Sequence, residues 1–160
     1  MSVLNEPYTA EPADNKLPDS IRDQFLTFVI DNEDYGIEIA YVTSIIRMQA
    51  ITKVPHMPDY IAGITNLRGD LIGVIDVRKR FGKPQRDYDE FNCIIVIEWD
   101  DYMLGLIVDG VKETVTIESE NVIAPPNAKL NHHNQYIKNI GKVGSTVRLL
   151  LDLERFLAQE

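Results

Sequence analysis

The chain has few of the residue types on which disulfide-bonded and metal-binding proteins rely. Its 160 residues include one cysteine, three histidines and one tryptophan. A single cysteine, Cys93, excludes an intramolecular disulfide and a cluster of thiolate ligands. Cys93 lies within the apolar run 92–97, where we expect a buried and inert thiol.

Basic charge and long apolar runs are also scarce. The 16 Lys and Arg residues are outnumbered by 25 Asp and Glu residues, so the formal net charge is −9. An acidic surface repels phosphate backbones and anionic lipids, so we expect no nucleic-acid partner and no insertion into a membrane. No run approaches the roughly 20 apolar residues of a membrane span. The first residues carry acids and prolines where a signal peptide would be apolar, so the sequence predicts a cytoplasmic protein.

Patterns typical of catalysis or metal binding are missing as well. His132 and His133 are adjacent, and adjacent side chains of a strand point to opposite sides, so joint chelation is not favoured. The acidic run 31–34 resembles the start of a calcium loop, but Val42 stands where the loop requires a bidentate Glu. No nucleophile elbow, phosphate-binding loop or zinc-protease motif is present. We predict no catalytic residue, metal or cofactor, although an active site assembled without a motif stays open.

What is present is an ordinary globular mixture, 44% hydrophobic and 26% charged. Residues 1–22 hold three prolines, several acids and no periodic apolar pattern, which predicts a disordered tail before a domain at 23–160. From there on, short β-branched and aromatic runs alternate with turn residues, a pattern typical of β-barrels or sandwiches. The predicted strands cover residues 25–30, 35–39, 42–48, 71–77, 94–99, 103–108, 113–117, 138–143 and 146–151.

Two short segments, 77–81 and 153–158, are the predicted helices, and Asp76 and Asp152 are placed to cap them. The first helix carries the one basic cluster of the chain, made of Arg78-Lys79-Arg80 with Lys83 and Arg86. We expect a solvated face there, with a contact patch for an acidic partner as the alternative.

The chain also contains a weak internal sequence repeat. Phe25, Gly36 and Val42 are followed 69 positions later by Ile94, Gly105 and Val111, and the motif 75–77 recurs 76 positions later at 151–153. The pattern predicts an internal duplication with an inserted loop at 126–135. Each half is too small to be stable alone. We therefore expect two halves, about 23–90 and 91–160, that share one core and whose terminal segments can exchange.

The most informative segment is 58–82. It contains Tyr60-Ile61-Ala62-Gly63, then Asn66-Leu67-Arg68-Gly69, then Ile75-Asp76-Val77-Arg78. The two glycines, Gly63 and Gly69, predict positions where the backbone turns or is closely approached. The planar guanidinium of Arg68 suits either neighbouring oxygens or a partner.

This segment resembles the signature of the CheW family, and so do the runs 33–39 and 105–111. The resemblance extends from about Gln24 to Leu157, and Gly73 departs from it because many relatives place proline there. It implies an all-β fold of two similar five-stranded SH3-like β-barrel halves on a shared core, with a short C-terminal helix. It also implies a non-enzymatic chemotaxis adaptor that joins the cytoplasmic tip of a chemoreceptor to the regulatory domain of the histidine kinase CheA.

The resemblance further implies two sets of contact residues. A groove between the halves, suited to an α-helical receptor tip, would use Val42, Gly63, Arg68, Gly105, Val108 and Val111. The outer edge of the first half would bind the kinase through Ser44, Ile45 and Ile72.

Three alternatives stay open at this point. One is a CheW-like regulatory domain detached from a kinase or from a receiver-linked coupling protein; the sequence contains no kinase or receiver motif, so a free-standing adaptor is favoured over it. A small-barrel enzyme or ligand-binding protein would be indicated by a cavity with convergent polar groups. An SH3-like nucleic-acid binder is opposed by the acidic charge.

Overall fold

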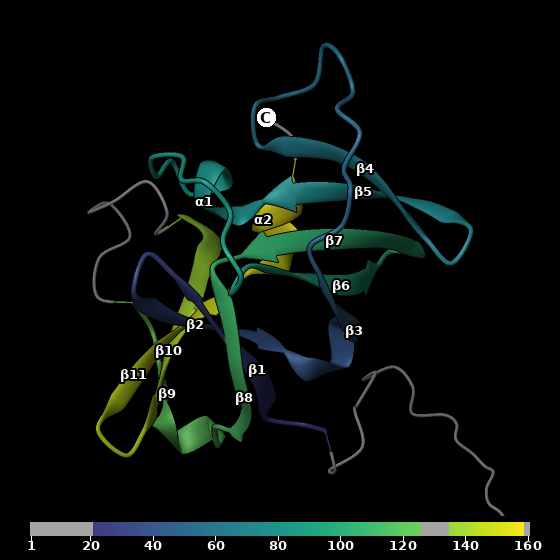
Figure 1. Cartoon of the computed structure of the whole chain (residues 1–160). Helices are drawn as coiled ribbons and strands as arrows, with labels where there is room; N and C mark the ends of the chain where they lie inside the picture. The colour runs from purple at the N-terminus through teal and green to yellow at the C-terminus, as the bar shows by residue number, and fades with distance from the viewer. Residues whose placement is uncertain (1–20, 126–134, 159–160) are drawn as a thin grey trace, which may run out of the picture.

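Two β-sheets form the protein, as a computed structural model of residues 21–125 and 135–158 shows (Figure 1). One sheet has the order β8-β1-β2-β11-β10-β9 and the other β3-β6-β7-β5-β4. The predicted all-β fold of two similar halves is confirmed. The strands are β1 (Gln24–Ile30), β2 (Glu33–Glu38), β3 (Val42–Arg47), β4 (Ile61–Leu67), β5 (Asp70–Asp76), β6 (Cys93–Trp99), β7 (Tyr102–Val108), β8 (Gly110–Thr116), β9 (Val122–Ile123), β10 (Ile137–Val143) and β11 (Thr146–Leu151); the helices are η3 (Ile39–Tyr41), α1 (Val77–Arg80), η4 (Ser119–Asn121) and α2 (Leu153–Leu157).

Neither sheet is made from one continuous half of the chain. The β1–β2 hairpin joins β8 to β11, with β2 parallel to β11, and the β6–β7 hairpin joins β3 to β5, with β7 parallel to β5. Figure 1 shows this exchange as the dark N-terminal strands lying beside the yellow C-terminal ones. The two halves are therefore interleaved, and each sheet needs strands from both.

Corresponding residues of the two sheets make the same contacts. Gly36 lies opposite Leu150 in the first sheet, and Gly105, 69 positions later in the chain, lies opposite Val74 in the second. The backbone N–H of Asp76 donates to the carbonyl of Tyr60 at 2.8 Å, and that of Asp152 donates to Tyr136 at 2.7 Å. Repeated pairings at a constant sequence offset are what an internal duplication produces.

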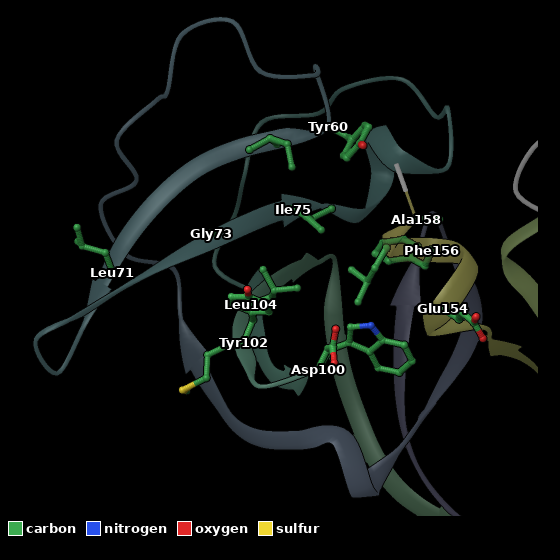
Figure 2. Close-up of a pocket in the computed structure, with 14 residues that line it drawn as sticks. Tyr60, Leu71, Gly73, Ile75, Asp100, Tyr102, Leu104, Glu154, Phe156 and Ala158 are labelled. Carbon is green, nitrogen blue, oxygen red and sulfur yellow. The ribbon is translucent and has the colours of Figure 1, made fainter. Parts of the chain in front are cut away.

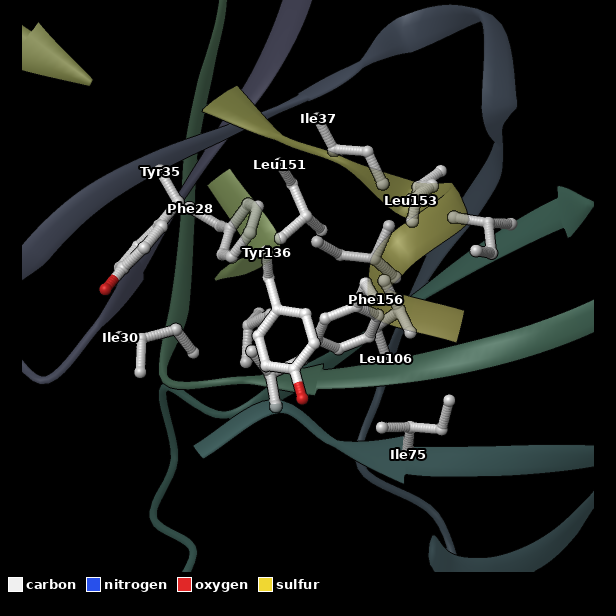
Figure 3. Close-up of a cluster of buried hydrophobic side chains, with 14 of the residues drawn as sticks. Phe28, Ile30, Tyr35, Ile37, Ile75, Leu106, Tyr136, Leu151, Leu153 and Phe156 are labelled. Carbon is white, nitrogen blue, oxygen red and sulfur yellow. The ribbon is translucent and has the colours of Figure 1, made fainter. Parts of the chain in front are cut away.

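The main core lies between the sheets and takes side chains from both (Figure 3). Phe28 and Tyr35 come from the first sheet, and Ile75 and Leu106 come from the second. Each sheet also encloses a smaller cluster of its own, Phe25, Ile117 and Leu150 in the first and Ile72, Val74, Ile94, Val96 and Ile107 in the second.

The two helices cross over to the opposite sheet. Both are single turns, and the predicted caps are confirmed: the carboxylate of Asp76 accepts from the N–H of Lys79 at 3.3 Å, and that of Asp152 accepts from Arg155 at 3.2 Å. After the cap, α1 leaves β5 and packs toward the β1–β2 hairpin, where the Phe81 and Tyr35 rings lie 5.2 Å apart. In the same way α2 leaves β11 and lies over the second sheet.

Two strands, β4 and the two-residue β9, were not predicted, and one expectation about the surface was wrong. Strand β4 was not predicted, because its Gly63 and Asn66 disfavour strands and a register shift between Ile61 and Gly63 interrupts its pattern. The basic cluster was expected on a solvated face, yet Arg78 and Arg80 are both buried. Residues 1–20 of the predicted tail (1–22) and the His132–His133 pair lie outside the described residues.

Candidate functional site

A buried ionic network joins the two halves where β7 passes into β8. Nη1 of Arg78 donates to Oδ2 of Asp109 at 2.8 Å, and the same oxygen accepts from the backbone N–H of Asp31 at 2.7 Å. The Arg78 and Asp109 side chains are only 10% and 7% exposed. Since Asp109 N also donates to the Val29 carbonyl at 3.0 Å, this network fixes the start of β8 against the end of β1. The sequence could not reveal it, because its members are distant in the chain.

The rest of the predicted basic cluster extends this network. Nζ of Lys83 lies 3.6 Å from the Asp31 carboxylate, and Nη2 of Arg86 lies 3.7 Å from Oδ1 of Asp109. With Lys79, whose Nζ lies 3.7 Å from Asp59, four of the cluster's five cations form ion pairs within the chain.

Two of the predicted receptor-binding residues, Val42 and Val111, occupy equivalent places in the two halves. Val42 begins the edge strand β3 and lies opposite Ile97, while Val111 lies near the start of the edge strand β8, opposite Phe28. Both valines are half-buried against the main core. The structure therefore keeps both at the boundary between core and surface.

Gly105 and Val108 lie deeper. Strand β7 is paired on both sides, by β6 and β5. A Cβ at Gly105 would stand 2.7 Å from Cγ2 of Ile94, and Val108 is fully buried. These two residues pack the sheet and offer no side-chain surface.

Gly63 and Arg68 lie at opposite ends of β4. Gly63 is buried with φ +144°, and a Cβ there would stand 2.1 Å from the Thr52 carbonyl oxygen. Arg68, exposed at φ 53°, forms the β4–β5 turn with Gly69, whose N–H donates to Oδ1 of Asn66 at 2.9 Å. Only Arg68 of the two presents a side chain to solvent.

The three predicted kinase-binding residues also include both exposed and buried side chains. Ile45 is 46% exposed on the edge strand β3, and Ser44 beside it is half-buried. Ile72 is buried in the cluster enclosed by the second sheet. The exposed part of this set is thus a short stretch of β3.

A cavity of about 650 Å³ lies between α2 and strands β5 and β7 (Figure 2). Its lining is mostly apolar and aromatic, and its carboxylates are those of Asp100 and Glu154, both exposed. The lining contains no histidine, cysteine, serine or lysine.

Groups with altered pKa values are scattered rather than gathered at one place. Burial and a hydrogen bond to Glu33 raise the pKa of Tyr35 far above its usual range. Burial and a 2.7 Å hydrogen bond to Asp76 do the same to the pKa of Tyr88. Cys93 was expected to be buried but is only half-buried; its partial burial still raises the pKa of the thiol, which disfavours a reactive thiolate. Within residues 21–125 and 135–158, no three metal-ligating side chains form a cluster and no helix is long and apolar enough to cross a membrane.

The family model described as CheW-like domain matches residues 24–160. The chain belongs to the CheW family. A chemotaxis protein CheW of Klebsiella aerogenes is 32% identical over 142 residues, covering 89% of this chain and 86% of that protein. CheW of Bacillus subtilis is 29% identical, covering 86% and 88%. The crystal structure of the scaffolding protein CheW from Thermoanaerobacter tengcongensis matches with a TM-score of 0.75 and 32% identity, over 81% of this chain and 88% of that one.

The family, the two-barrel fold and the role of a non-enzymatic adaptor, all expected from the sequence, are confirmed by these matches. A chemotaxis protein CheV3 of Helicobacter pylori is also similar, at 30% identity, but the match covers 40% of that protein.

Proposed function

We propose that this CheW-family protein couples the cytoplasmic tip of a chemoreceptor to the kinase CheA in a signalling array. The observation that carries the proposal is the 0.75 TM-score, at 32% identity, to a protein described as a scaffold. A rigid frame supports it physically, because strands of both halves make each sheet and a buried ion pair closes their junction. Such a frame holds two partners in one geometry.

For the receptor, the accessible candidates are Val42, Val111 and Arg68. A receptor tip is an α-helical hairpin, and apolar side chains at the edges of two packed sheets suit a helix laid along them. Gly63, Gly105 and Val108 would support this surface from below, because they are buried. The kinase would bind the outer edge of β3 through Ile45 and Ser44, with Ile72 supporting that strand from inside.

A scaffold alters kinase output only if it binds the receptor's signalling states differently, or if it fixes receptor and kinase in one arrangement. The equivalent positions of Val42 and Val111 in edge strands of different sheets favour the first mechanism. A receptor contact that spans both residues would weaken or strengthen when the receptor changes shape.

The receptor surface is tested with Val111→Asp and Arg68→Ala. We expect each to weaken binding of a purified receptor cytoplasmic hairpin, Val111→Asp by about tenfold or more because an apolar contact of the proposed interface becomes charged. Titration by calorimetry measures this, with circular dichroism to confirm folding. Thr114→Ser, on the same strand and exposed, is the control and should bind as wild type. If both variants are folded and bind the receptor as wild type does, the receptor does not bind this surface.

The kinase surface is tested with Ile45→Asp. We expect affinity for an isolated CheA regulatory domain to fall about tenfold, since an exposed apolar contact is replaced by a charge, while receptor binding persists. Val147→Asp is a matched control, because Val147 is similarly exposed, at 49%, but lies on the other sheet. If the Val147 variant loses the kinase and the Ile45 variant keeps it, the kinase binds the opposite sheet. If wild type binds neither partner, the coupling function itself is wrong.

A further inference from the structure

The cavity between α2 and the second sheet belongs to neither candidate surface, and two acids, Asp100 and Glu154, line it. Of the residues described, none forms an ion pair or hydrogen bond with the Asp100 or Glu154 carboxylates in the structure. Asp100 lies on the β6–β7 turn and Glu154 on α2, and both line the cavity (Figure 2).

The internal duplication provides a counterpart of this cavity in the first sheet, under α1, where side chains fill the equivalent space. Asp100 repeats Asp31 after 69 residues, and both adopt φ 54° at the first position of their hairpin turns. Glu154 repeats Arg78 after 76 residues, each being the second residue of its helix. In the first sheet the pair Arg78–Asp31 bridges helix and turn at 3.6 Å. In the second sheet the same two positions carry two carboxylates, which cannot bridge one another.

The apolar part of the cavity also differs from its counterpart in the first sheet, because a smaller residue leaves space there. Gly73 pairs with Leu104 in the second sheet, and their counterparts Leu149 and Tyr35 pair in the first. There the Tyr35 ring is fully buried and the Leu149 side chain packs against the core. Around Gly73 the space is open, because a Cβ would meet only Cδ2 of Leu104, at an ordinary 3.7 Å.

We propose that this cavity is a docking site for a basic amphipathic segment of a partner protein. An Arg or Lys side chain of the segment pairs with Asp100, in the role that Arg78 has toward Asp31 in the other half, and Glu154 adds a second negative charge to the lining. A large apolar side chain of the segment fills the space over Gly73, in the role of Leu149. The proposal goes beyond the coupling function and does not depend on Val42, Val111 or Ile45.

The surroundings fit a peptide segment better than an enclosed small molecule. The apolar lining continues onto exposed side chains at the tips of the two hairpins, with Leu71 68% and Tyr102 69% exposed. Exposed apolar surface next to a cavity is typical of a protein-interaction site. The acidic mouth, on a chain of net charge −9, attracts a basic segment and repels an acidic one.

The test uses a synthetic, tryptophan-free helical peptide of about 18 residues, five turns of helix, with Leu and Phe on one face and Arg on the other. Its twin carries Glu in place of each Arg. Trp99 lines the cavity and is the only tryptophan of the chain, so its emission reports occupancy of this site. We expect saturable binding of the Arg peptide with a shift of Trp99 emission, and affinity for the Glu peptide lower by at least about tenfold, the effect of one charge contact.

Two variants close the cavity in the way the first sheet does. Gly73→Leu copies Leu149, and Glu154→Arg restores the Arg–Asp combination with Asp100. We expect each to lower affinity for the Arg peptide by at least about tenfold, a typical loss for a blocked anchor site. Glu118→Gln, exposed near η4 of the other sheet, removes one acid elsewhere and should leave binding unchanged. Glu154 is exposed, so this variant decides the matter if Gly73→Leu does not fold.

Several results would overturn the proposal. One is no binding of the Arg peptide up to about 1 mM, the limit of weak association. Another is equal binding of the Arg and Glu peptides, or wild-type affinity in Glu154→Arg. Self-association of the wild type that Gly73→Leu abolishes would instead place a second copy of the chain in the cavity. None of these outcomes depends on receptor or kinase binding.

Discussion

Asp109→Ala is expected to lower the free energy of unfolding by about 3–5 kcal/mol, the range for breaking a buried ion pair on one side. The substitution leaves the buried guanidinium of Arg78 without its 2.8 Å partner and the N–H of Asp31 without its acceptor. Urea denaturation followed by circular dichroism measures the loss. Because the network joins β1, β8 and α1, the transition should remain cooperative while its midpoint falls.

Two further variants separate the ion pair from general disturbance. Lys112→Met breaks an exposed pair with Asp34, and we expect a cost of no more than about 1 kcal/mol. The double variant Arg78→Met/Asp109→Leu removes both charges, so it should recover much of the stability lost in Asp109→Ala. If Asp109→Ala costs no more than Lys112→Met, the buried network does not stabilise the junction of the halves.

Much of the fold was predictable because strands leave a strong pattern. Apolar runs such as 94–97, set between acidic turns, identified most strands, and the constant offsets of 69 and 76 identified the duplication. The caps Asp76 and Asp152 were also found, since a cap is a local feature. The exchange of strands between sheets has no such local signal, because it depends on pairing between residues far apart.

The site was less predictable, for the same reason. A family resemblance carries residue types but not their exposure, so buried Gly105, Val108 and Ile72 were named beside exposed Arg68 and Ile45. Signals for the cavity were present in the offsets. The two halves differ in side-chain volume at Gly73 and its counterpart Leu149, and in charge at Glu154 and its counterpart Arg78. These differences become informative only once each helix is known to pack on the opposite sheet.

These differences suggest how one duplicated frame acquired unlike surfaces. In the first sheet, the Tyr35 ring and the Arg78–Asp31 bridge close the region under α1. In the second, Gly73 and a pair of acids leave the region under α2 open. The central parallel pairing is the same in both sheets, so the difference between these two regions lies in a few side chains.

The glycine at position 63 provides the last test, because it distinguishes a receptor contact from a packing requirement. Its φ of +144° is reached readily only by glycine, and a Cβ would stand 2.1 Å from the Thr52 carbonyl oxygen. Thr52 cannot withdraw freely, since it exchanges hydrogen bonds of 2.8 and 2.9 Å with Ile64. We expect Gly63→Ala to cost about 3 kcal/mol or more, from backbone strain and the loss of these hydrogen bonds.

Gly69→Ala is the matched control, because Gly69 also has positive φ, at +91°, but no atom lies within 4 Å of its Cβ position. Strain alone should cost about 1–2 kcal/mol there. Thermal unfolding ranks the two variants, and receptor titration below both transitions shows whether binding follows stability. If Gly63→Ala is as stable as Gly69→Ala yet loses the receptor, Gly63 is a contact residue. If its binding loss tracks unfolding, Gly63 acts by allowing β4 to pack against Thr52, and Arg68 at the far end of that strand remains the candidate for direct contact.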